Sequence, residues 1–74
     1  MRSLSIIAHE IYFDWKKVNY GAKPYLEAMR ELETIDDAYM SDSGRSIVRY
    51  FLSNASTWRG EIAKRVKAEL KAML

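Results

Sequence analysis

Apolar residues recur near the start of the chain at spacings of three and four, which predicts an amphipathic helix over about residues 5–17. One face of this helix carries Leu4, Ile7, Ala8, Ile11 and Trp15. Ile6 and Phe13 fall on a second face, roughly opposite Ile11. A helix that is apolar on two sides either packs on both sides at the centre of a fold or presents a patch to a partner. We favour the central position and keep the patch as the alternative.

The same periodicity predicts three further helices, over about residues 24–33, from residue 42 or 43 to 53, and from residue 56 or 57 to the end. Residues 34–41 are expected to form a connector with a single helical turn near residues 35–39. A tight polar turn, Ser53-Asn54-Ala55-Ser56, is expected to join the last two helices.

These elements predict a compact all-α fold in which residues 1–74 form a single domain of four helices, with a helix-turn-helix-like hairpin at the C-terminal end. The expected core consists of Leu4, Ile7, Ile11, Trp15, Leu26, Met29, Leu32, Ile47, Val48, Phe51, Leu52, Trp58, Ile62, Val66 and Leu70. A chain of 74 residues is near the small end of what folds alone, so this core is marginal.

Charge is distributed unevenly along the chain. The net charge is +2, but residues 1–44 carry five positive and eight negative side chains, whereas residues 45–74 carry seven positive and two negative ones. An asymmetry of this kind indicates an anionic partner for the basic half.

Nucleic acid is the partner that we favour, because the last two predicted helices carry most of the basic residues. The candidate nucleic-acid-binding residues are Arg45, Arg49, Thr57, Arg59, Lys64, Lys67 and Lys71. Thr57, Arg59, Gly60 and Lys64 would face a groove, and Arg45, Arg49, Lys67 and Lys71 would meet phosphates. Lysines near a helix C-terminus are also explained by the helix dipole alone.

The sequence Asp42-Ser43-Gly44-Arg45-Ser46 opens the third predicted helix with residues that bind phosphate when one is present. The same residue types commonly cap a helix without any ligand. We favour capping for this segment.

A protein-interaction module is the competing function. Its candidate contact residues are Ile6, Phe13, Tyr20, Tyr39 and Tyr50, residue types that anchor interfaces. Such a surface would bind an acidic protein partner or a second copy of the chain.

No catalytic constellation is evident in the sequence, so we expect a protein that is not an enzyme and that needs no cofactor and no metal. His9 is the one histidine, and cysteine is absent. Asp36 and Asp37 form an adjacent carboxylate pair, which we interpret as a solvated start of a turn rather than a metal or catalytic site.

The N-terminal region lacks an apolar run long enough for a signal peptide, because His9 and Glu10 interrupt it. No stretch approaches the length needed to cross a bilayer. We therefore expect a cytoplasmic protein without a membrane partner.

Four stretches resemble a group of short proteins of bacterial genomes, phages and mobile elements that have no assigned activity. They are Ile-Tyr-Phe-Asp-Trp-Lys (11–16), Lys-Pro-Tyr-Leu-Glu-Ala-Met (23–29), Asp-Ser-Gly (42–44) and Tyr-Phe-Leu-Ser-Asn-Ala-Ser-Thr-Trp-Arg-Gly-Glu (50–61). The resemblance covers nearly the whole chain and implies a standalone small protein that acts on nucleic acid or on a host or element protein. It brings no site residues with it.

Overall fold

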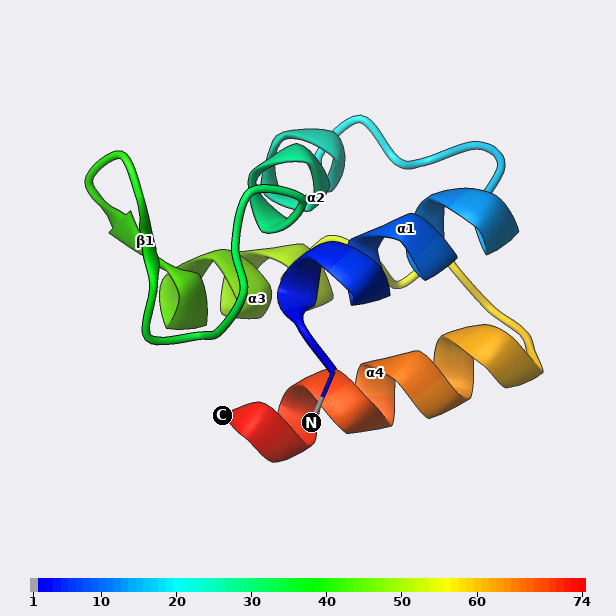
Figure 1. The fold of residues 1–74 in the computed structure, drawn as a ribbon. Coiled ribbons are helices and arrows are strands. Elements are labelled where there is room, and N and C mark those ends of the chain that lie inside the picture. Colours follow the sequence, from blue (N-terminus) through cyan, green and yellow to red (C-terminus); the bar gives the residue numbers. More distant parts are fainter. Residues whose placement is uncertain (1) are drawn as a thin grey trace.

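Four helices and one short β-hairpin are seen in residues 2–74, the part of the chain that the computed structural model describes (Figure 1). The elements are α1 (Leu4–Asp14), α2 (Lys23–Met29), β1 (Ala38–Tyr39), β2 (Asp42–Ser43), α3 (Gly44–Ser53) and α4 (Glu61–Met73). The prediction of a mainly helical fold is confirmed. None of the helices in residues 2–74 is long and apolar enough to span a membrane.

The packing brings α1 against both α2 and α4, while α3 lies against α2 (Figure 1). Every predicted core residue is buried except Leu52 and Ile62, which are half-buried and pack against the core. Small side chains fill the remaining space between the elements, namely Ala8, Ala22, Ala28, Ala55 and Ala63. The apolar stripes of the sequence therefore identify the core closely, although they do not show which helix meets which.

The prediction that α1 packs on both sides is wrong. Ile6 and Phe13 are 55% and 76% exposed, because α2 and α4 both contact α1 on the face that carries Leu4 and Ile11. The second apolar face of α1 is therefore on the surface.

Serine side chains cap two of the helices. The hydroxyl of Ser3 accepts from the amide of Ile6 at the start of α1, and the hydroxyl of Ser43 accepts from Ser46 at the start of α3. A Cβ on Gly44 would lie only 2.8 Å from the carbonyl oxygen of Thr34, so glycine fits this close approach. Capping and packing therefore account for the Asp42–Ser46 segment without a phosphate.

The connector between α2 and α3 differs from the prediction. A turn at Thr34 to Asp37 is followed by a β-hairpin in which Ala38 pairs with Ser43 and Tyr39 with Asp42, so the expected helical turn does not extend through Tyr39. Helix α2 ends at Met29, where the chain turns. Beyond this turn, the carbonyl oxygens of Leu32 and Glu33 accept hydrogen bonds from the first backbone amides of α1.

The start of α4 was predicted too early. The connection from α3 spans residues 54–60, and α4 begins at Glu61. Gly60 adopts φ 114° and ψ 179°, a conformation almost restricted to glycine, which separates Trp58 from the helix. The expected tight turn at Ser53–Ser56 is thus only the first part of a longer connection.

Three aromatic rings meet where this connection crosses the core. Trp15 and Trp58 stack with ring centroids 5.8 Å apart, and Phe51 packs edge-on against both rings. The indole Nε1 of Trp58 donates a 2.8 Å hydrogen bond to Asp14 Oδ2. Trp58 therefore fixes the position of the α3–α4 connection against the end of α1.

Candidate functional site

A row of basic side chains runs along one side of α4. Lys64, Lys67 and Lys71 follow one another along the helix at spacings of three and four residues, so they share a face. Arg59 lies just before the helix. Together these four residues, Arg59, Lys64, Lys67 and Lys71, are called the α4 basic row.

A shallow hollow of about 430 Å³ lies at the N-terminal end of the row. Arg59, Lys64 and Lys67 line it together with Trp58 and Glu61. The three cations therefore border one surface feature, although the carboxylate of Glu61 offsets part of their charge.

Lys67 is the most enclosed member of the row. Its Nζ donates a 2.6 Å hydrogen bond to the carbonyl oxygen of Trp58 and lies 5.8 Å from the centroid of that ring. Partial burial lowers the pKa of Lys67 from its usual value, and the charges of Lys71 and Arg59 lower it further. An anion bound beside these side chains would relieve their mutual repulsion.

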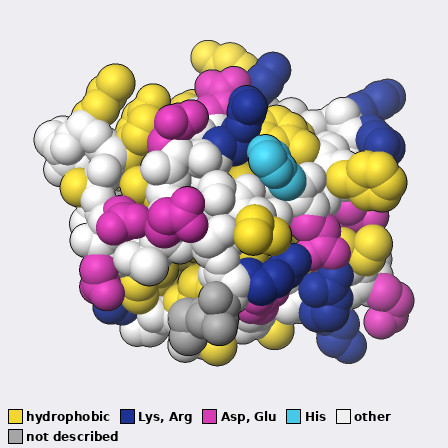
Figure 2. Space-filling model, viewed as in Figure 1, with side chains coloured by type: hydrophobic (Ala, Val, Ile, Leu, Met, Phe, Trp, Pro, Cys, Tyr) yellow, Lys and Arg dark blue, Asp and Glu magenta, His cyan; other side chains and the backbone are white. Residues whose placement is uncertain are grey.

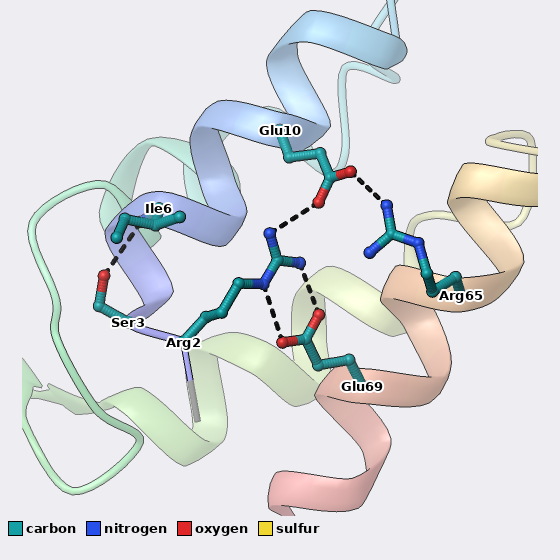
Figure 3. A network of polar contacts seen from close by, with 6 residues as sticks. All are labelled: Arg2, Ser3, Ile6, Glu10, Arg65 and Glu69. Carbon is teal, nitrogen blue, oxygen red and sulfur yellow. Dashed lines mark hydrogen bonds and ion pairs between the residues drawn. The ribbon is translucent and has the colours of Figure 1, made fainter.

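A separate network of ion pairs holds α4 against the N-terminal segment (Figure 3). Arg2 Nη1 lies 2.8 Å from Glu10 Oε1, and Arg2 Nε and Nη2 donate to the Glu69 carboxylate at 3.0 and 2.6 Å. Arg65 Nη2 pairs with Glu10 Oε2. The hydrogen bond from Arg65 and then that from Arg2 lower the pKa of Glu10, and the hydrogen bond from Arg2 lowers the pKa of Glu69.

This network leaves the α4 basic row without acidic partners. Within residues 2–74, every ion pair belongs to Arg2, Glu10, Arg65 and Glu69. On the face in Figure 2, acidic side chains lie over the connection between α2 and α3 on the left and also beside Lys and Arg side chains on the right. None of the four side chains of the row therefore forms an ion pair within residues 2–74, although Glu61 offsets part of their charge.

The ion pairs predict how stability depends on pH. Both glutamates have a lower pKa in the folded state than in the unfolded chain, so the unfolded state takes up protons first as the pH falls. The pairs should stabilise the fold above about pH 4.3, and this contribution should be lost as the pH drops further. We expect the double variant Glu10→Gln and Glu69→Gln to have a lower Tm than the wild type at pH 7 and a smaller decrease in Tm between pH 5 and pH 3.

Circular dichroism melts across this pH range would measure the effect. Glu31→Gln is the matched control, because Glu31 is exposed and belongs to no ion pair within residues 2–74. A double variant that kept the whole acid sensitivity of the wild type would contradict the role of the network.

The other predicted nucleic-acid contacts are more dispersed. Arg45 Nη1 donates a 2.8 Å hydrogen bond to the carbonyl oxygen of Leu74, which links α3 to the end of α4. Arg49 and Thr57 are exposed, and neither side chain makes a hydrogen bond or ion pair within the described part of the chain. The structure thus brings the α4 residues together but does not connect Arg49 or Thr57 to them.

The candidate protein contacts come from several elements. Tyr20, in the connection after α1, is 93% exposed, and Tyr50, on α3, is 54% exposed and stacks on Tyr25 at 5.4 Å. Tyr39 is half-buried and packs against the core. With Ile6 and Phe13 of α1, the exposed members of this set come from α1, the connection after it, and α3.

Asp36 and Asp37 lie on the turn that follows α2. Asp37 Oδ2 accepts from the amides of Glu33 and Thr34 at 2.9 and 3.0 Å, and these bonds lower its pKa. The carboxylate therefore caps the turn. His9 is exposed on α1, and residues 2–74 contain no group of three or more potential metal ligands.

Sequence reasoning missed the ion-pair network and the contact between Lys67 and Trp58. Glu10 and Arg65 are 55 positions apart, and Arg2 and Glu69 are 67 apart. Local spacing carries no signal for such pairs, since they depend on how α1 lies against α4.

Comparison with known proteins found no matching family model, no similar curated protein and no similar solved structure.

Proposed function

We propose that this protein binds nucleic acid through the α4 basic row. The observation that carries the proposal is that Lys64, Lys67 and Lys71 lie on one side of α4, with Arg59 just before the helix, and that none of the four forms an ion pair among the described residues. Such a cluster attracts the phosphate backbone, because neutralising phosphates releases condensed counterions.

Helix α4 is the element that lies against the nucleic acid in this proposal. Arg49 and Thr57 are exposed and would add contacts at the edge of the interface, as would Arg45 if it released the carbonyl of Leu74. Because α4 packs mainly on α1, the proposal does not require α3 and α4 to act as a helix-turn-helix-like pair. That arrangement stays a prediction.

A salt titration tests the proposal. Binding to a labelled duplex of about 20 base pairs would be followed by fluorescence anisotropy. Four phosphate contacts should give a slope of about −3 to −4 in a plot of log affinity against log salt, or roughly a hundredfold loss between 50 and 200 mM salt. No binding at about 20 mM salt, where such contacts are strongest, would contradict the proposal.

A protein-interaction surface is the second candidate function, and the exposure of Ile6 and Phe13 on α1 favours it. Large apolar side chains on a surface helix are residue types that anchor interfaces. If no nucleic acid binds, this face becomes the leading candidate, and sedimentation measurements would show whether the protein associates with itself.

A further inference from the structure

We propose that the α4 basic row contacts the phosphate backbone of a double-stranded nucleic acid and reads no base sequence. This inference rests on the proposed function and specifies its ligand. The inference depends on which side chains remain free, in the folded protein, to reach the edges of the bases.

Sequence readout in the major groove uses mainly Arg or Lys side chains that pair with guanine and Asn or Gln side chains that pair with adenine. The chain contains no glutamine. Its two asparagines are both used within the fold: Asn19 Nδ2 donates to the carbonyl of Asn54, and Asn54 Nδ2 donates to the carbonyl of Tyr50. No amide side chain is therefore available to recognise adenine.

Most arginines are also engaged. Arg2 and Arg65 belong to the ion-pair network, Arg45 bonds to Leu74, and Arg30 lies 5.6 Å from the ring centroid of Tyr12. Arg49 and Arg59 are the exposed arginines without such a contact among residues 2–74. Neither of them lies on α4.

Beside the row, the exposed surface of α4 carries alanines, the carboxylate of Glu61, and Arg65, which pairs with Glu10. Ala68 and Ala72 lie exposed near Lys64 and Lys71. Lysine binds phosphate as a point charge, whereas the fork of arginine gives geometric selectivity. A helix face of this composition has charge for a backbone, and it lacks the amide side chains that recognise adenine.

The spacing of the row suits a duplex backbone. Lys64 and Lys71 are about 10 Å apart along the helix axis, since each residue adds about 1.5 Å. One strand of B-DNA presents a phosphate about every 3.4 Å along its axis, so about three phosphates lie along this length. Single-strand binding sites instead stack bases on exposed aromatic rings, and Trp58, the ring beside the row, is only 2% exposed.

Selection from a pool of random DNA duplexes, followed by sequencing of the bound fraction, tests this inference. We expect base frequencies to stay as in the starting pool, and affinities for individual duplexes to agree within about threefold. Sequence-specific proteins bind their sites about 10³- to 10⁷-fold more tightly than other DNA. An RNA duplex and a DNA single strand of the same length complete the comparison, and the single strand should bind more weakly than the DNA duplex.

The variants Arg59→Lys and Arg49→Lys test the inference further, because each keeps the charge and removes the arginine fork. If only phosphates are contacted, both variants should show the same absence of base preference as the wild type in the selection, even where the loss of the fork weakens overall affinity. An enriched motif bound more than about a hundredfold more tightly than the pool, or a single strand bound more tightly than the duplex, would overturn the inference and leave the proposed function intact. If no nucleic acid bound at low salt, the proposed function itself would fail.

Discussion

Replacing Trp58 with alanine is expected to lower the free energy of unfolding by about 3–5 kcal/mol. The ring is buried, stacks on Trp15, packs against Phe51 and donates its Nε1 hydrogen to Asp14. Removal would leave a cavity between α1 and α3 and an acceptor on Asp14 without its donor. A domain of this size has a stability of about 4–11 kcal/mol in total, so the variant would lie near the limit of folding.

Chemical denaturation followed by circular dichroism at 222 nm would measure this loss. Trp58→Phe keeps an aromatic ring and removes the indole donor, so it should fold and lose a smaller amount, about 1–3 kcal/mol. Phe13→Ala is the control, since Phe13 is an exposed aromatic residue and its replacement should change stability by no more than about 0.5 kcal/mol. A loss below about 1 kcal/mol for Trp58→Ala would show that the aromatic cluster does not hold the connection in place.

The second large effect is expected on nucleic-acid binding. The triple variant Arg59→Gln, Lys64→Gln and Lys71→Gln should reduce affinity for duplex DNA by about 10²- to 10³-fold at about 100 mM salt and reduce the salt slope by about 3, if each side chain neutralises one phosphate. Lys67 is left in place because its Nζ bonds to the carbonyl of Trp58 and supports the connection. The three replaced side chains are exposed, so the variant should retain its fold.

A second triple variant, Lys16→Gln, Lys17→Gln and Lys23→Gln, is the matched control. It removes the same charge from exposed positions outside α4. Comparison of the two variants by anisotropy separates a localised contact surface from a general effect of net charge. Equal losses of affinity in the two variants would contradict the assignment of binding to the α4 basic row.

The candidate site depends on tertiary structure more than the core does. Arg65 lies on the same helix as the three lysines and is just as basic in the sequence, yet it pairs with Glu10 of α1. Arg2 is likewise held by Glu10 and Glu69. Which cations remain free for a ligand is decided by the placement of α1 on α4, and no local spacing could show it.

The boundary of α4 illustrates the same limit. Ser56 and Thr57 are good helix caps by residue type. Trp58, however, packs in the core against Trp15 and Phe51, so the helix does not begin at these caps. The conformation of Gly60 then delays the helix until Glu61. Long-range burial of one large ring outweighs the modest advantage of a local cap.

The sequence by itself determined the helical class, the residues of the core and the excess of positive charge in the C-terminal part, because periodicity and composition are local properties. The tertiary structure alone decided that α1 has an exposed apolar face, that α4 begins after Gly60, and that Arg59, Lys64, Lys67 and Lys71 stand without acidic partners in residues 2–74. These features depend on contacts between residues far apart in the chain. Such contacts form only when the helices pack together.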